Sequence, residues 1–242
     1  MNGIQVKNLV KTYTTQSTDI ILNGAKRPST TRTVLHGVSV DFPAGKLTAI
    51  LGRSGCGKST LLRLIDGTKD TPDSGEIVMP EGWRCALLSP DPYVITWTSV
   101  ERPPEERLEL AKKLVKLVRL EDYADMTPVE LSTGMRQRLG LARVLASQAQ
   151  VLLMDEPFAS LDFITRGELQ AELLDIQKEL QKTILLVTHQ LDEALLLAQK
   201  IVVLHADSSV RVWELELPYP RDLTSPQLAA LREEITAECR KD

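Results

Sequence analysis

A short segment early in the chain combines glycines, one lysine and several hydroxyl side chains. It reads Gly52, Arg53, Ser54, Gly55, Cys56, Gly57, Lys58, Ser59 and Thr60. This spacing matches a phosphate-binding loop, in which glycines let successive backbone N–H groups converge on phosphate oxygens. We expect Lys58 to reach the β- and γ-phosphates and the Ser59 hydroxyl to bind Mg²⁺. A chance glycine-rich turn is the alternative, and the strand and helix expected on either side disfavour it.

The residues around the loop predict the order of elements that such a loop needs. An apolar run at 47–51 is expected to be a buried strand, and a helix is expected at 58–66. Further buried strands are predicted at 151–154 and 184–187, each followed by a helix, and two more strands at 4–10 and 34–42. Alternating strands and helices predict an α/β fold, a P-loop core whose mainly parallel sheet is covered on both faces.

Three stretches fall outside this core. The Thr/Ser-rich stretch 14–33 is expected to be a long exposed loop, and 101–125 to belong to a small helical subdomain. Apolar positions alternate over 210–217, and a final helix with Pro226 in its first turn is capped by Thr224 or Ser225. We treat 1–242 as one domain, with the loop region and helical subdomain at about 85–140 and a C-terminal extension at 206–242.

Composition excludes several classes of protein. The net charge is -4, which does not favour bulk binding to nucleic acid. The three cysteines are far apart without metal-ligand spacing, which fits a reducing cytosol. No apolar run is long enough to span a bilayer, and the first residues do not have the pattern of a signal peptide. Any membrane part is therefore expected to be another chain.

A second motif follows the predicted strand at 151–154, which ends in Asp155 and Glu156. Asp155 is placed to hold Mg²⁺, directly or through water. Glu156 points to the other side, because side chains alternate along a strand, and it could activate an attacking water. The alternative is a solvated acidic pair, which the nearby phosphate loop disfavours.

The segment 131–138, LSTGMRQR, opens a predicted helix ahead of the acidic strand and resembles the signature sequence of ABC ATPases. The order of motifs is also similar: phosphate loop, signature, acidic strand, the segment 159–162 and then Thr188 and His189. The resemblance covers nearly the whole chain and implies an antiparallel β part beside the core. Softer similarities, including 189–195 and the tail 216–222, point to the importers of nitrate, sulfonates and taurine.

The resemblance implies roles for five further positions. Tyr13 would stack on adenine, and Ser132 and Gly134 would contact the γ-phosphate held by a second subunit. Asp162 corresponds to an aspartate of the inter-subunit loop, and His189 to a catalytic switch histidine. From the residues alone, Tyr13 is better explained as a strand aromatic, and His189 fits either core packing or catalysis.

A family assignment also implies cofactors and partners. The cofactors are ATP and Mg²⁺. The partners are integral-membrane permease subunits, a second ATPase subunit (the same chain or a related one) and a solute-binding protein, with the ATPase peripheral on the cytoplasmic face of the cell membrane. The cargo would be a small anion such as nitrate, sulfonate or taurine. Alternatives are a weakly catalytic regulatory subunit, a soluble ABC ATPase of translation or DNA repair, and a P-loop kinase. His36 and His205 match no motif and are expected to be structural or surface residues.

Three departures from the family pattern bear on the alternative of a weakly catalytic regulatory subunit. Thr133 stands where the signature has glycine, and Pro90 stands where the family has glutamine, counting back from Trp97. Proline has no side-chain amide and no backbone N–H. The stretch between Trp97 and the signature is also shorter than usual. We still expect ATP binding, and these departures bear on hydrolysis and on coupling to a permease.

Overall fold

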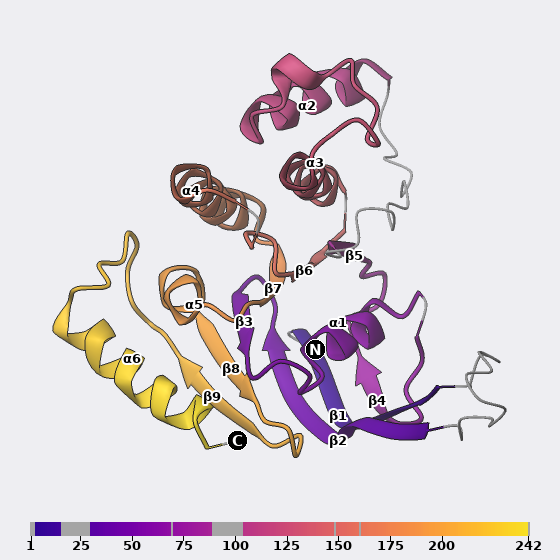
Figure 1. The fold of residues 1–242 in the computed structure, drawn as a ribbon, viewed down its shortest axis with the longest axis vertical. Coiled ribbons are helices and arrows are strands. Elements are labelled where there is room, and N and C mark those ends of the chain that lie inside the picture. The colour runs from indigo at the N-terminus through magenta and orange to yellow at the C-terminus, as the bar shows by residue number, and fades with distance from the viewer. Residues whose placement is uncertain are drawn as a thin grey trace, which may run out of the picture.

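The computed structural model describes residues 3–15, 30–68, 70–88, 104–147, 149–159 and 161–241. Two sheets organise this part of the chain (Figure 1). The larger has the strand order β5-β6-β7-β3-β8-β9, and the smaller has the order β2-β1-β4. Pro90 and Trp97 lie outside the described residues, so the expectation built on them stays a prediction from sequence.

The larger sheet forms the centre of the molecule. Its strands are β3 (Leu47–Leu51), β5 (Cys85–Leu88), β6 (Val151–Asp155), β7 (Thr183–Val187), β8 (Lys200–Leu204) and β9 (Val210–Glu214). The first five pair in parallel, and β9 adds antiparallel to β8 at the edge. The predicted strands 47–51, 151–154 and 184–187 are therefore confirmed, within a mainly parallel sheet.

Side chains that alternate along the central strands enter two separate cores. In β7, Ile184 and Leu186 pack in one core, and Leu185 and Val187 in the other. The first core receives α2 (Pro104–Leu117), α3 (Thr133–Ala146), α4 (Phe163–Leu180), α5 (Leu191–Leu197) and α6 (Pro226–Cys239). The second core receives α1 (Lys58–Asp66) and the smaller sheet. Burial on both faces explains why β3, β6 and β7 are nearly continuous apolar runs rather than alternating ones.

The smaller sheet consists of β1 (Gly3–Thr15), β2 (Thr30–Pro43) and β4 (Ser74–Val78), all antiparallel. The prediction of a loop from 14 to 33 is wrong at both ends, because β1 continues to Thr15 and β2 begins at Thr30. Threonine favours strands, and cross-strand contacts such as that between the Thr12 and Thr33 hydroxyls, 3.1 Å apart, stabilise this polar ribbon. Residues 16–29 lie outside the described part.

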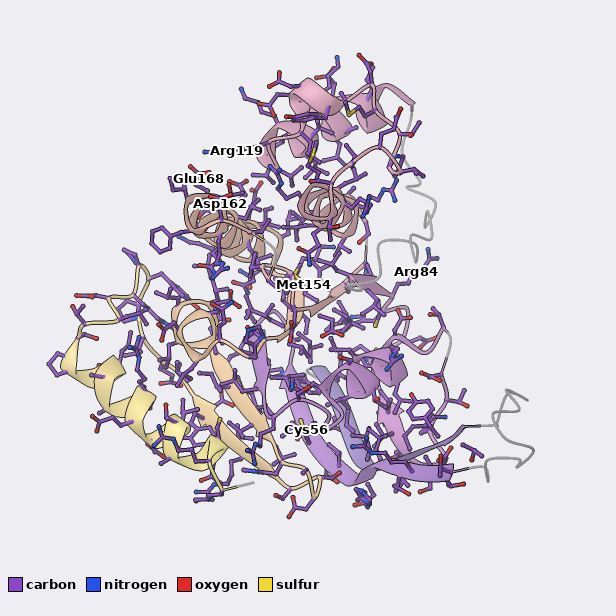
Figure 2. The ribbon with its side chains drawn as sticks, viewed as in Figure 1. Cys56, Arg84, Arg119, Met154, Asp162 and Glu168 are labelled. Atoms are coloured by element: carbon purple, nitrogen blue, oxygen red, sulfur yellow. The ribbon has the colours of Figure 1, made fainter. Side chains whose placement is uncertain are left out.

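The helical stretch predicted at 101–125 contains α2 and the short 3₁₀ helix η1 (Glu121–Tyr123). Pro104 is the first residue of α2, where the missing N–H costs nothing. Figure 1 shows α2 and α3 together at one end of the molecule, with α3 between α2 and the larger sheet. An ion pair between Arg119 and Glu168 joins the turn after α2 to α4, as Figure 2 shows.

The tail crosses the outside of the larger sheet as α6, beside β8 and β9 (Figure 1). Of the two predicted caps, Ser225 is the one used: its hydroxyl accepts from the Leu228 N–H. The alternating apolar positions noted at 210–217 include the strand β9, which ends at Glu214. Arg221 then donates to the carbonyls of Leu195 and Ala198, at 2.7 and 2.6 Å, and so satisfies acceptors at the end of α5. The strands β4, β5 and β8 were not predicted.

Candidate nucleotide site

Two glycines fix the loop between β3 and α1. Gly52 has φ 149°, and a Cβ there would lie 2.3 Å from the Leu204 carbonyl oxygen. Gly57 has φ 107°, and a Cβ there would lie 2.5 Å from Leu35 Cδ2. Only glycine fits both positions, because the loop packs against β8 on one side and β2 on the other. The turn places the N-terminus of α1, with its free N–H groups, at an open cavity.

Lys58 is held inside this loop. Its side chain is 8% exposed, and Nζ donates to the carbonyl oxygens of Gly52 and Arg53 at 2.7 and 2.9 Å. Nζ also lies 3.9 Å from Sγ of the buried Cys56. The ammonium group is therefore anchored in the loop by neutral carbonyl acceptors.

The cavity has a volume of about 580 Å³ and brings together segments from several strands. Among the predicted residues, its wall includes Tyr13, Ser54, Gly55, Gly57, Lys58, Ser59, Thr60, Glu156 and His189. Gly52, Arg53 and Cys56 shape the loop behind this wall. Tyr13 enters from near the end of β1, and Glu156 and His189 come from the ends of β6 and β7. A cavity at the carboxyl ends of parallel strands is the usual ligand position in open α/β sheets.

The two predicted metal ligands are neighbours. Asp155, the last residue of β6, is 9% exposed, and the Ser59 side chain donates a hydrogen bond to it. Burial raises the pKa of the Asp155 carboxyl, whereas the Ser59 hydrogen bond opposes that rise. A buried carboxylate beside a hydroxyl gives two hard oxygen donors, which suits Mg²⁺ because that ion keeps most of its ligands as water and phosphate oxygens.

Glu156 and His189 face one another across neighbouring strands. Glu156 Oε1 lies 3.2 Å from His189 Nδ1, and the Glu156 N–H donates to the Val187 carbonyl at 2.9 Å. Glu156 has φ 50°, an uncommon conformation for a residue other than glycine, and one that costs on the order of 1 kcal/mol. Glu156 lines the cavity and Asp155 does not, so the two carboxylates lie in different surroundings.

Behind His189, a set of polar contacts fixes the turn into α5. The Thr188 hydroxyl donates to Glu193 Oε2 at 2.6 Å, and Gln190 Oε1 accepts from Arg166 Nη1 at 3.0 Å. Burial raises the pKa of the Glu193 carboxyl, with the Thr188 hydrogen bond opposing. These contacts restrict the backbone on both sides of His189.

The signature residues lie apart from this cavity. Ser132 caps α3 and is exposed, with its hydroxyl accepting from the Met135 N–H at 3.3 Å. Thr133 is the first helical residue, and its hydroxyl accepts from Arg136 Nη2 at 3.2 Å. Neither Ser132 nor Gly134 lines the cavity. The threonine is accommodated in ordinary helical backbone, so no glycine is needed at that position for this fold.

Asp162 also lies away from the cavity. Its carboxylate caps α4 by accepting from the N–H groups of Ile164 and Thr165 at 3.1 and 3.0 Å, and these bonds lower the pKa of the carboxyl. Figure 2 shows Asp162 beside α4 and well separated from Cys56 of the phosphate loop. Ser160, in the same motif, lies outside the described residues.

Sequence reasoning missed several residues of the cavity wall: Arg32, Val34, Arg63 and Val187. Arg32 was assigned to a loop, whereas it lies on β2 opposite Tyr13 in the strand register. The signal that could have found it is the run of β-branched residues around it. His205 is buried and lies 3.3 Å from Glu238 of α6, and the exposed His36 donates its N–H to Ser208 Oγ, so neither belongs to the cavity.

Comparison with known proteins identifies the family to which the chain belongs. Residues 35–159 match the ABC transporter family. The aliphatic sulfonates import ATP-binding protein SsuB of Granulibacter bethesdensis is 37% identical, over 91% of this chain and 94% of the relative. The chain belongs to the ABC transporter family. The predicted family and fold class are therefore confirmed.

Two further ABC proteins extend the comparison. The bicarbonate transport ATP-binding protein CmpC of Synechococcus elongatus is 36% identical, over 83% of this chain and 34% of that longer protein. The ATP-binding cassette MJ0796, solved as a dimer bound to ADP and Pi, superposes with a TM-score of 0.73 at 25% identity, covering 89% of this chain and all of that one. The chain is thus an ABC-type ATPase, and the predicted cofactors ATP and Mg²⁺ are those of its family.

Proposed function

We propose that this ABC ATPase powers an importer of a small anion, with ATP bound in the cavity beside α1. In this arrangement Tyr13 stacks on the adenine, the loop at 52–60 surrounds the phosphates, and Ser59 with Asp155 holds Mg²⁺. The observation that carries the proposal is the cavity itself. Tyr13, the anchored Lys58, Glu156 and His189 come from four separate segments and converge on one space.

The roles of Glu156 and His189 follow from their position. A Mg²⁺ ion bound at Ser59 and Asp155 would neutralise charge on the β- and γ-phosphate oxygens. Glu156 accepts the proton of an attacking water, since its carboxylate lines the cavity without being bound to Lys58. His189 donates to the γ-phosphate and, through its other ring nitrogen, contacts Glu156. The conformational strain at Glu156 is consistent with a role in positioning that water.

A second ATPase subunit completes the site in this proposal. Ser132, Gly134 and Asp162 lie outside the cavity, so they act on ATP only across an interface. Two identical subunits joined head to tail by a two-fold axis would place each signature opposite the other subunit's phosphate loop. Closure around ATP then supplies the energy for transport, because ATP binds the closed state more tightly than the open one. A homodimer is the simplest form.

Other proposed partners are the permease subunits and a solute-binding protein, with the ATPase peripheral on the cytoplasmic face. None of the helices that the structure describes is long and apolar enough to cross a membrane. The names of the relatives, for sulfonates and bicarbonate, support an anionic cargo. We retain the division into one domain with a helical subdomain near 85–140 and a C-terminal extension at 206–242; the latter would brace the sheet edge through Arg221.

Copurification tests the proposal. The full-length protein is captured from salt-washed native membranes, and the proteins retained with it are identified by mass spectrometry. A multi-span permease is expected, together with ATPase activity that rises when an anion and its binding protein are supplied. Recovery without any permease would contradict a transport role. A permease complex that binds Mg-ATP without releasing phosphate would favour the regulatory alternative suggested by Thr133 and Pro90.

A further inference from the structure

The Tyr13 ring is restrained at one end and on one face. Its hydroxyl donates to Asp70 Oδ2 at 3.0 Å, and Lys11 Nζ lies 5.3 Å from the ring centroid. Lys11 and Tyr13 are two positions apart on β1, so their side chains lie on the same face of the strand. Burial, and then the Asp70 hydrogen bond, raise the pKa of the Tyr13 phenol, which therefore stays a donor at neutral pH.

The lysine over the ring is itself anchored. Its Nζ donates to the Thr71 carbonyl at 2.7 Å and lies 3.6 Å from Asp73 Oδ1, and only 13% of its side chain is exposed. The Asp73 N–H in turn donates to the Val10 carbonyl at 2.9 Å. The connection between α1 and β4, at residues 70–73, therefore packs along the end of β1. It supplies Asp70 and anchors Lys11, the two residues that contact the ring.

We assign the ring face opposite Lys11 to a ligand in the cavity. Tyr13 lines the cavity, whereas Lys11 and Asp70 do not. Because an anchored cation covers one face, a flat ligand in the cavity can stack only on the opposite face. Any base can stack on an aromatic face, so the Tyr13 ring would favour ligands that carry a base without selecting which base.

We propose that Asp70 and Lys11 are positioning residues, which hold Tyr13 as a preformed platform and leave one ring face for the purine of ATP. This inference rests on the proposed function, in which Tyr13 stacks on adenine. Asp70 acts through the Tyr13 hydroxyl and Lys11 through the covered face. A ring that is fixed before binding loses little freedom when the base stacks on it, and this improves affinity without any new contact to the nucleotide.

The test compares a ligand that has a base with one that lacks it. Calorimetry measures the affinities for Mg-ATP and for Mg-tripolyphosphate. Tyr13→Phe and Asp70→Ala should each weaken Mg-ATP binding about three- to tenfold, and the double variant should be no weaker than the weaker single one. Asp70→Asn should keep most of the affinity, because its amide oxygen still accepts from Tyr13. Lys11→Ala should also weaken Mg-ATP binding. Tripolyphosphate affinity should be unchanged in Tyr13→Phe and Lys11→Ala; Asp70→Ala also removes the carboxylate that lies 4.0 Å from Arg63 Nε.

Glu76→Gln is the matched control, since it removes an ion pair with Lys7 in the same sheet and should change neither affinity. Unchanged Mg-ATP affinity in Tyr13→Phe and Asp70→Ala would overturn the proposal. In that case, lower affinity of Lys58→Ala for both Mg-ATP and tripolyphosphate would still support the nucleotide site itself. A parallel fall in tripolyphosphate affinity in Tyr13→Phe or Lys11→Ala would overturn it too, by showing a general disturbance of the loop. If Lys58→Ala left both ligands bound normally, the proposed function would fail, and the platform with it.

Discussion

His189 Nδ1 lies 3.2 Å from Glu156 Oε1, across the ends of the neighbouring strands β7 and β6. The two residues are far apart in sequence, and the parallel pairing of Asp155 with Val187 brings them together. Both side chains line the cavity beside the phosphate loop. The contact lets the histidine orient the carboxylate that we propose acts at the γ-phosphate, so hydrolysis should depend on both groups.

Glu156→Gln should bind Mg-ATP normally. Its turnover should fall by roughly a hundredfold, because the amide cannot accept the water proton. The same variant should accumulate an ATP-bound dimer. Phosphate release and size-exclusion chromatography with ATP measure the two effects. Glu179→Gln, at an exposed carboxylate of α4, should behave as the wild type. Normal turnover in Glu156→Gln would show that another group activates the water.

Lys58→Ala should weaken Mg-ATP binding by roughly ten- to hundredfold, since a charge-assisted contact to phosphate contributes about 1.5–3 kcal/mol. The substitution also leaves two loop carbonyls without their donor, so the loop itself should become less ordered. Calorimetry measures the affinity. Lys112→Ala, at an exposed lysine of α2, serves as the control. Equal affinities in Lys58→Ala and in the wild type would rule out the phosphate assignment.

Asp155→Asn should stabilise the nucleotide-free protein and abolish its stabilisation by Mg-ATP. Burial raises the pKa of this carboxyl in the folded state. Above that raised pKa, folding must therefore bury a charge that the unfolded chain exposes, and the cost disappears as the pH falls and the group is protonated. The gain from Asp155→Asn should accordingly be present at neutral pH and shrink toward acid pH. Thermal unfolding with and without Mg-ATP checks this, and a lower melting temperature in the apo variant would contradict it.

Arg32→Gln should weaken Mg-ATP binding about three- to tenfold and make the affinity less sensitive to salt. Arg32 lines the cavity, with Nη2 3.8 Å from the position that a Gly55 Cβ would occupy, and it has no acceptor among the residues that the structure describes. Arg32→Lys should keep part of the affinity. Arg84→Gln, at an exposed arginine elsewhere on the surface (Figure 2), is the control. Identical salt dependence in Arg32→Gln and the wild type would exclude a contact with phosphate.

Local sequence determined much of the fold. The phosphate loop, the apolar strands β3, β6 and β7, and the cap of α6 depend on residues close together in the chain. The Thr-rich ends of β1 and β2 were missed because threonine carries no apolar periodicity. Those ends are strands only because each pairs with the other.

The site required the tertiary structure. Sequence alone predicted a phosphate-binding loop at 52–60, because glycine spacing and a following helix are local properties. Only the tertiary structure decided that Tyr13, Arg32, Glu156 and His189 share the cavity with that loop, and that Asp70 holds Tyr13. The physical reason is that periodicity reports which side of a strand is buried, whereas strand order and register decide which distant side chains meet.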